Sequence, residues 1–219
     1  MIDITAMMIT GHQAERRKYA LLAVRSFLRQ TYDKSQLLIV NQGESLRIDD
    51  PRVVELFVET GNKTVGDLRN YALDRIDTPF VAVWDDDDWK RKDYLEYMRS
   101  HLTDDLDAVF LSKQIAYDWT TGKCYYRHKA VPEGVIYLPS ASLVRNLPYR
   151  YPSLNKASDG FYAGCFKRRA VLDNESGIFV RTYHGLNIWQ QKDIIDGKEL
   201  PESKEVRTML DEYRAKRTK

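Results

Sequence analysis

The sequence predicts an α/β fold: a mostly parallel sheet with helices on both faces, followed by a region of mixed strands. Two observations in the first half of the 219 residues carry this prediction. Short apolar runs alternate with segments of helical periodicity, which implies parallel strands joined by helical crossovers. Some of these runs are apolar at every position, as in strands that are covered on both faces. Hairpin signals replace the alternation in the second half and predict the mixed strands.

Four apolar runs are predicted strands, at residues 4–9, 37–40, 53–58 and 80–84. Residues 16–30 carry apolar side chains at helical spacing between charged ones, so they are a predicted helix. A second helix begins at Thr64, whose hydroxyl is expected to cap the backbone N–H of Asp67. It should end before Thr78, because a residue that precedes proline disfavours helical geometry.

The second half has strand signals at residues 108–111, 134–138 and 177–183. Residues 113–119 and 123–127 flank Thr120-Thr121-Gly122 and predict a hairpin. Residues 147–156 lack periodicity and are expected to form a loop, whereas residues 201–216 are a predicted terminal helix. Because no repeat or low-complexity linker interrupts the chain, we expect one continuous domain with halves at residues 1–106 and 107–219.

Composition excludes several classes of protein. With 43% hydrophobic and 30% charged residues, the chain is globular rather than disordered or fibrous. No apolar run approaches the ~18 residues that span a bilayer, and the N-terminus lacks the pattern of a signal peptide. Cys124 and Cys165 are far apart in sequence, which removes the main support for a disulfide framework or a cysteine zinc site. We therefore expect a cytoplasmic protein with reduced thiols and no membrane insertion.

The strongest signal for a functional site is the acidic run Asp85-Asp86-Asp87-Asp88. It directly follows the apolar strand 80–84, and ligands of such sheets bind outside the carboxyl ends of the strands. Four adjacent carboxylates repel one another there unless a cation neutralises them. Because carboxylate oxygens are hard ligands, Mg²⁺ or Mn²⁺ is the expected cation. His12 and the pair Asn41-Gln42 follow other strands and are expected at the same edge.

Two segments resemble the family 2 glycosyltransferases of the GT-A fold. They are Thr64-Val65-Gly66-Asp67-Leu68-Arg69-Asn70-Tyr71-Ala72-Leu73 and the strand with its acidic run, residues 80–89. In that family a Gly-x-x-x-Arg-Asn-x-Gly-like helix precedes an apolar strand that ends in a D-x-D motif. Here the gap from Gly66 to Arg69 is shorter, and Leu73 stands where the second glycine often lies. The opening strand, loop and helix up to Tyr32 also match, so the resemblance covers about residues 2–102 well.

The resemblance implies a metal-dependent, inverting transfer of a sugar from a nucleotide-sugar. Asp85 would contact the ribose or sugar and, with Asp87, would lie at the metal, while Arg69 would lie near the diphosphate. Ser158-Asp159-Gly160 occupies the place of the family's Glu-Asp, whose Asp is the general base for the acceptor hydroxyl. His184, in a stretch similar to His-Gly-x-Asn-Thr-Trp, would contact metal or diphosphate. The donor-binding candidates are Thr10, His12, Asn41, Gln42, Arg69, Asp85 and Asp86, and the metal candidates are Asp87, Asp85 and His184.

Each of three assignments has a structural alternative: a surface arginine at 69, a helix N-terminal aspartate at 159 and a loop histidine at 184. The chain also departs from the family after the second strand. Where the family usually has Asp-Asp-Gly-Ser, with an Asp that reads the uracil edge, this chain has Asn41-Gln42-Gly43-Glu44. An amide accepts a hydrogen bond from uracil but also donates one, so the base stays open, with a uridine diphosphate sugar as the default donor.

Charge and aromatic residues bear on the acceptor. Residues 1–106 hold 15 basic and 19 acidic residues, a net charge of −4, and residues 107–219 hold 19 and 13, a net charge of +6. We therefore expect a nucleotide-sugar-binding first half and an acceptor-binding second half that faces something anionic. Ordinary tyrosine-rich packing is the alternative. The acceptor-side candidates are Trp89, Tyr126, Arg127, Tyr151, Lys156 and Trp189.

Several acceptors and activities stay open. A hydroxymethylated base in DNA, as for a phage-type enzyme in a host cytoplasm, is favoured over a surface polysaccharide or other glycan. Such a base would have to flip out of the duplex to reach the metal. A nucleotidyltransferase is the second candidate, although Thr10-Gly11-His12-Gln13 is a poor cradle for a triphosphate. The third is a catalytically inactive nucleic-acid-binding module, which has no evident reason to keep four crowded carboxylates.

Overall fold

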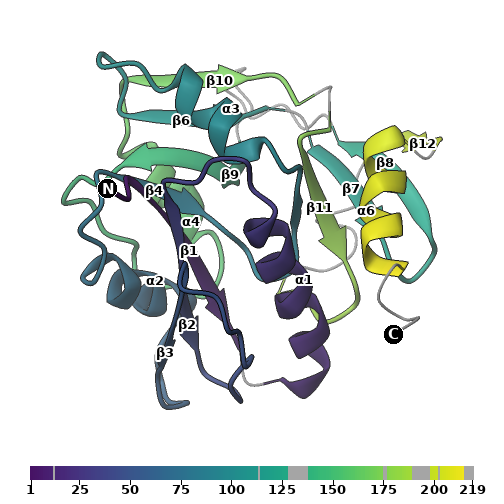
Figure 1. Cartoon of the computed structure of the whole chain (residues 1–219), viewed down its shortest axis with the longest axis horizontal. Coiled ribbons are helices and arrows are strands. Elements are labelled where there is room, and N and C mark those ends of the chain that lie inside the picture. The colour runs from purple at the N-terminus through teal and green to yellow at the C-terminus, as the bar shows by residue number, and fades with distance from the viewer. Residues whose placement is uncertain are drawn as a thin grey trace.

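The computed structural model confirms the predicted α/β fold. It describes residues 1–11, 13–112, 114–127, 138–174, 177–188, 198–201 and 203–214. A seven-stranded sheet has the order β10-β6-β9-β4-β1-β2-β3, and a five-stranded sheet has the order β12-β8-β7-β11-β5 (Figure 1). In the larger sheet β1 is parallel to β2 and β4, β2 to β3, and β10 to β6. Only β9 runs antiparallel to its described neighbours, β4 and β6.

The strands are β1 (Ile4–Thr10), β2 (Ser35–Asn41), β3 (Val53–Phe57), β4 (Phe80–Val83), β5 (Trp89–Lys90), β6 (Ala108–Leu111), β7 (Gln114–Asp118), β8 (Lys123–Arg127), β9 (Leu138–Arg145), β10 (Arg169–Leu172), β11 (Phe179–Tyr183) and β12 (Lys198–Leu200). The helices are the 3₁₀ helix η1 (Ala14–Arg16) and the α-helices α1 (Arg17–Leu28), α2 (Val65–Leu73), α3 (Tyr94–His101), α4 (Ser158–Gly164) and α6 (Lys204–Arg214). None of the helices in the described ranges is long and apolar enough to cross a membrane.

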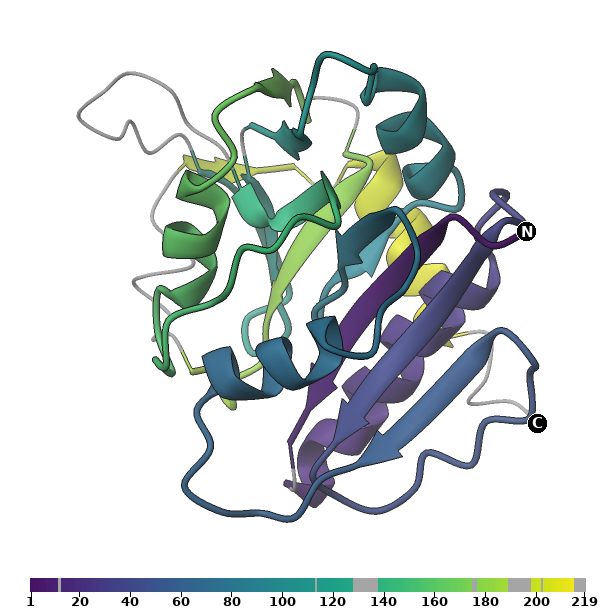
Figure 2. The same ribbon diagram turned by 90° about the vertical axis from the view of Figure 1, so that its left-hand side faces the viewer.

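Helices cover both faces of the larger sheet, as predicted. On one face α1 and α3 contribute residues such as Phe27 to a buried cluster, and on the other α2 and α4 contribute residues such as Leu68. Neighbouring residues of β1 serve opposite faces, with Met8 in the first cluster and Met7 in the second. In Figure 2, α2 and α4 lie in front of the sheet and α1 lies behind it.

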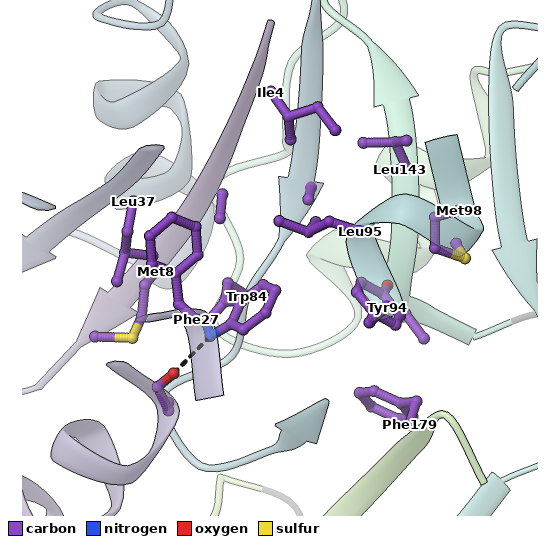
Figure 3. Close-up of a cluster of buried hydrophobic side chains, with 14 of the residues drawn as sticks. Ile4, Met8, Phe27, Leu37, Trp84, Tyr94, Leu95, Met98, Leu143 and Phe179 are labelled. Carbon is purple, nitrogen blue, oxygen red and sulfur yellow. Dashed lines mark hydrogen bonds between the residues drawn. The ribbon is translucent and has the colours of Figure 1, made fainter. Parts of the chain in front are cut away.

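Trp84, the residue after β4, fixes the point where the acidic run begins. Its ring is fully buried and packs edge-on against Phe27, at 5.7 Å between centroids, and against Tyr94, at 6.0 Å (Figure 3). Its Nε1 donates a hydrogen bond of 3.0 Å to the carbonyl oxygen of Ala23 in α1. Because the indole is enclosed and its N–H is satisfied, the chain leaves the sheet at a defined position.

The smaller sheet packs against the terminal helix. β7 and β8 form the predicted antiparallel hairpin, and β11 joins β7 in parallel and β5 in antiparallel register. Val206, Met209 and Leu210 of α6 bury their side chains against Trp89 of β5 and neighbouring residues. Figure 1 shows α6 beside β7, β8 and β11, on the far side of the molecule from β2 and β3.

The structure differs from the sequence expectations in several elements. The terminal helix begins at Lys204 instead of Pro201, and α3, β5 and β10 were not predicted. β9 was missed because Pro139, Ser140 and Ser142 break its apolar pattern, yet pairing with β4 and β6 satisfies its backbone on both sides. Of the predicted strand 134–138, only Leu138 lies within the described residues.

Candidate active site

A cavity of about 280 Å³ lies at the carboxyl ends of β1, β2 and β4. Because these strands are parallel neighbours, their carboxyl ends meet at one edge of the sheet, as expected for a ligand site in this class of fold. Segments from the second half of the chain complete its wall. The lining residues are Ile9, Thr10, Gly11, Gln13, Arg16, Gln42, Val65, Leu68, Arg69, Asp85, Asp86, Asp87, Asp88, Asn155, Ala157, Ser158, Asp159, Arg181, Leu186, Asn187 and Ile188.

Helix α2 connects the two halves of the site. The backbone N–H of Gly66 donates to the carbonyl oxygen of Leu154 at 3.1 Å. The side chain of Asn70 both donates to and accepts from the backbone of Tyr151, at 2.9 and 2.8 Å. These bonds hold the segment that leads into α4 against α2, so Arg69 of α2 and Asp159 of α4 line the same cavity.

The four carboxylates of the acidic run have two different surroundings. Asp86 accepts a hydrogen bond from the Thr10 hydroxyl at 2.8 Å, and Asp88 accepts one from the backbone N–H of Thr182 at 2.9 Å. These bonds tie the run to β1 and to β11. The side chain of Asp85 keeps 28% of its surface exposed and that of Asp87 keeps 12%, against 6% for Asp86. Asp85 and Asp87 are therefore the carboxylates most accessible from the cavity.

Their protonation also differs. Burial raises the pKa of Asp85 despite the nearby Arg69 guanidinium, and it raises the pKa of Asp86 to about 6 despite Arg16. Burial, with the charges of Asp87 and Asp85, also lifts the pKa of Asp88 well above its usual value. Burial opposes ionisation of Asp87 too, but the hydrogen bond from His184 and the charge of Arg16 hold its pKa below the usual value. Asp87 is thus the carboxylate that its neighbours keep ionised.

His184 bonds Asp87 and is absent from the residues that line the cavity. Its ring stacks on Tyr19 at 4.0 Å and 14°, and its side chain has no exposed surface. Nδ1 accepts a hydrogen bond from the backbone N–H of Leu186, which assigns the ring proton to Nε2, 3.1 Å from Asp87 Oδ2. Asn187 Nδ2 donates to the same oxygen at 3.0 Å. His184 therefore positions Asp87, and its two ring nitrogens are engaged by Asp87 and by Leu186. Because it is absent from the residues that line the cavity, its prediction as a contact of metal or diphosphate is a correction.

The carboxylates of the cavity fit a divalent cation whose coordination shell is completed by substrate and water. Asp85 and Asp87 present hard carboxylate oxygens to the same cavity. Within the described ranges, no three His, Cys, Asp or Glu side chains converge as a full ligand set. Mg²⁺ is commonly bound by one or two carboxylates, with water and substrate phosphates in the remaining positions. Asp85 and Asp87 are therefore the residues of the acidic run that could hold such an ion.

Arg69 differs from its structural alternative, whereas Asp159 does lie at a helix N-terminus and lines the cavity as well. Arg69 is buried, with Nη2 3.2 Å from Asp85 Oδ1 and Nη1 3.4 Å from the Ser158 hydroxyl, so it is not a surface arginine. Asp159 lies in the first turn of α4, and its carboxylate lines the cavity. The residue before this helix, Ala157, has φ of 61°, a left-handed conformation that costs energy for a residue with a Cβ.

The structure brings most of the donor-side candidates together. Thr10, Gln42, Arg69, Asp85, Asp86, Asp87 and Asp159 all line the cavity. Asn41 is a correction: it is buried, its Nδ2 donates to Glu55 Oε1 at 2.6 Å, and its Oδ1 accepts from the backbone of Gly43. Its amide is consumed in shaping the turn after β2, which leaves Gln42 facing the cavity. His12 lies outside the described residues.

None of the acceptor-side candidates is among the residues that line the cavity in the described part of the chain. Trp89 is a correction, because it is buried against α6 and its Nε1 donates to Glu212 Oε2 at 2.9 Å. Tyr151 is a correction too, since it is buried beneath the Arg69 guanidinium, 5.1 Å from its ring centroid. Tyr126 packs against the cluster of α6 and is absent from the lining residues. Lys156 is exposed between two lining residues. Trp189 and the side chain of Arg127 lie outside the described residues.

Among the lining residues that were not predicted from the sequence are Arg16, Ser158, Arg181 and Asn187. For Arg16 a signal existed, because Arg16-Arg17-Lys18 opens a helix, where positive charge opposes the helix dipole. Asn187 stands in the stretch that resembles the family's His-Gly-x-Asn. Nothing in the local sequence distinguishes Arg181 from any other charged residue of a strand.

Comparison with known proteins decides the family. Residues 12–172 match glycosyl transferase family 2, which is nearly three quarters of the chain. The chain belongs to this family. EpsH of Bacillus subtilis (strain 168) is 27% identical to this family 2 chain over 114 residues, which are 48% of the chain and 32% of EpsH.

Solved structures of TarS from S. aureus share the fold. The complex of TarS 1–349 with UDP-GlcNAc has a TM-score of 0.68 at 14% identity, covering 98% of this chain and 66% of that one. The complex with UDP has a TM-score of 0.64 at 16% identity, covering 83% and 61%. This family 2 chain therefore spans about a third of EpsH and about three fifths to two thirds of these TarS chains.

Proposed function

We propose that this chain transfers a sugar from a uridine diphosphate sugar to an acceptor hydroxyl, with inversion at the anomeric carbon. The observation that supports this most is the convergence of Asp85, Asp87, Arg69 and Asp159 on one cavity at the carboxyl edge of the sheet. TarS, which has the same fold, forms complexes with UDP and UDP-GlcNAc, and this favours a uridine nucleotide as donor. Gln42, which lines the cavity, would read the base, because the Asn41 amide is engaged elsewhere.

The residues divide the reaction between them. Asp159 removes the proton of the acceptor hydroxyl as its oxygen attacks the anomeric carbon, and the bond to the diphosphate breaks on the opposite side. Arg69 contributes a fixed positive charge beside Asp85. A divalent cation held by Asp85 and Asp87 would supply the Lewis acidity that stabilises the leaving diphosphate. His184 and Asn187 keep Asp87 oriented toward the cavity.

Two classes of acceptor are candidates, a hydroxymethylated base in DNA and a glycan. The prediction of DNA drew on aromatic and basic residues, and burial of Trp89 and Tyr151 removes two of the acceptor-side candidates. Lys156 stays exposed beside the cavity, where a cation suits a phosphate as well as an acidic sugar. The proposal therefore concerns the nucleotide-sugar donor and the general base Asp159, and the turnover assay distinguishes the acceptors.

The test combines donor binding with turnover. Melting temperature is measured with UDP-sugars, other nucleoside diphosphate sugars and nucleoside triphosphates, each with and without Mn²⁺. A ligand at a hundredfold excess over its Kd stabilises the native state by about 2.7 kcal/mol, which such a scan resolves. We expect a metal-dependent shift with one UDP-sugar, and a shift with triphosphates alone would favour a nucleotidyltransferase instead.

Turnover is then followed as release of UDP, with hydroxymethylated DNA and with glycans as acceptors. Asp159→Asn should retain the donor-induced shift and lose turnover by a factor of at least ~10². Asp77→Asn removes an exposed carboxylate away from the cavity and should behave as wild type. Full turnover by folded Asp159→Asn would refute the role of Asp159 as general base. Salt-sensitive DNA binding without donor binding would favour an inactive nucleic-acid-binding module.

A further inference from the structure

The acidic run is accompanied by cationic side chains of the protein itself. Arg16, Arg69 and Arg181 line the cavity together with the four carboxylates. Lys90 is buried close by, with its ammonium 4.5 Å from the ring centroid of Trp84. Within the described part of the chain, four basic side chains thus accompany the four carboxylates of the run, and Asp159 adds a fifth carboxylate to the lining. The mutual repulsion of the carboxylates is therefore reduced even before any ion arrives.

Arg16 differs from the other three in what it binds. Its Nη2 lies 2.5 Å from Asp86 Oδ1 and 3.1 Å from Asp87 Oδ2, so a single guanidinium nitrogen bridges two carboxylates of the run. Its Nη1 donates to the carbonyl oxygen of Leu186 at 2.9 Å. The side chain is only 14% exposed, which limits competition by water. Arg16 therefore links the run to the segment that follows β11.

Arg16 also contacts Asp87, one of the two carboxylates proposed to hold a cation. Asp87 Oδ2 already receives hydrogen bonds from His184, which does not line the cavity, and from Asn187, which does. Arg16 approaches the same oxygen from the lining of the cavity. A second positive charge at this carboxylate would lie within a few ångströms of the guanidinium, and like charges at that separation repel strongly in a partly buried site.

We propose that Arg16 is the internal counter-cation of the acidic run, that it competes with a divalent ion for Asp87, and that its displacement releases the Leu186 carbonyl. The ion and the segment 184–188 are then coupled through one side chain. Loading of the site would loosen this segment, and a protein without the ion would keep it tied to the start of α1. This inference rests on the metal-binding part of the proposed function.

The test uses Mn²⁺ alone, without donor or acceptor, so that it does not depend on turnover. Mn²⁺ affinity is measured by calorimetry and by the signal of free Mn²⁺ in electron paramagnetic resonance, for wild type, Arg16→Gln and Arg16→Lys. We expect Arg16→Gln to bind Mn²⁺ roughly tenfold more tightly, because a charge that repels the ion is gone. Arg16→Lys keeps the charge and should stay within about threefold of wild type.

Arg17→Gln is the matched control. It removes the same charge from the next residue, but the Arg17 guanidinium donates to the backbone oxygens of Glu44 and Ser45 instead of the acidic run. Its Mn²⁺ affinity should equal that of wild type. An Arg16→Gln protein with native circular dichroism and unchanged or weaker Mn²⁺ binding would overturn the proposal, as would the absence of Mn²⁺ binding in both proteins.

Hydrogen exchange provides a second readout that does not require Arg16→Gln to fold. Mn²⁺ should raise exchange of the backbone amides of residues 183–188 in wild type, because the tie between Arg16 and Leu186 is lost. Arg17→Gln should show the same increase. If saturating Mn²⁺ leaves exchange in this segment unchanged or lowers it, the coupling is refuted, whatever the activity of the enzyme toward its donor.

Discussion

At Gly66 the two halves of the site are packed too closely to admit a side chain. A Cβ placed there would lie 1.9 Å from the carbonyl oxygen of Pro152 and 3.0 Å from its carbonyl carbon. Ordinary contact begins near 3.4 Å, so the carbonyl would have to retreat by about 1.5 Å. Backbone is the obstacle here, so no side-chain rotation relieves the clash. The change Gly66→Ala should therefore separate α2 from the segment that leads to Asp159.

The cost follows from the contacts that would be lost. The bond from Gly66 N–H to Leu154 and the bond from Val65 N–H to Asn155, both 3.1 Å long, each contribute about 1 kcal/mol. Overpacking adds about 2 kcal/mol, and the better helix propensity of alanine returns about 1 kcal/mol. We expect a loss of about 3 kcal/mol, which corresponds to a fall in Tm of about 6–12 °C for a chain of this size.

Urea unfolding and turnover together check this expectation. Gly164→Ala is the matched control, because Gly164 also lies in a helix and a Cβ there would meet nothing within 4 Å. It should be neutral or stabilising by up to about 1 kcal/mol. We expect Gly66→Ala to lose turnover even at temperatures where it is folded. An unchanged urea midpoint and unchanged turnover would show that the Pro152 carbonyl moves freely, which would refute the reasoning.

Three further predictions follow from the contacts described. Trp89→Phe should lower stability by about 1 kcal/mol in urea unfolding, because the hydrogen bond to Glu212 is lost, and should leave the acceptor KM unchanged; a raised KM would restore Trp89 as an acceptor residue. Arg69→Lys should lower kcat/KM roughly tenfold or more, since an ammonium does not reproduce the fork that bonds both partners, and wild-type kinetics would contradict this. The hydrogen bonds from Arg168 hold the pKa of Asp107 below its usual value, so the stability that they contribute is present above about pH 4 and is lost as the pH falls further. Asp107→Asn should flatten this acid limb in urea unfolding, and an identical limb in the variant would assign the loss to other groups.

Elements whose signals are local were predictable from the sequence. The capping of α2 is confirmed, since the Thr64 hydroxyl accepts from the Asp67 N–H at 3.2 Å and the Asp67 carboxylate accepts from the Thr64 N–H at 2.8 Å. The strand after it is buried at every position, as its continuous apolar run predicted. β9 depends on partners distant in sequence, and its polar residues hid it from any local pattern. Its place between β4 and β6 follows only from the assembled sheet.

The site shows the same division. The position of the acidic run was predictable, because a buried strand must deliver the next residues to the edge of the sheet. The separate surroundings of its four members were not, because Asp86 and Asp88 are tied by Thr10 and Thr182, which lie far away in the chain. The four identical residues therefore divide into two partly exposed carboxylates, Asp85 and Asp87, and two buried ones that anchor the run.

The repulsion within the acidic run is likewise reduced by residues distant in the chain. From the sequence, four adjacent carboxylates required an external cation, but Arg16 and Arg69 supply positive charge to the run from two different helical segments. Repulsion alone is thus no reason to expect a metal. The reason that stands is that Asp85 and Asp87 are the most accessible carboxylates of the run. The basic start of α1 was the local sign of this arrangement, because three cations there oppose the helix dipole. A cation at a helix N-terminus is locally unfavourable, and such exceptions are expected at functional sites. Arg16 is one of them, because its guanidinium binds Asp86 and Asp87 of the acidic run.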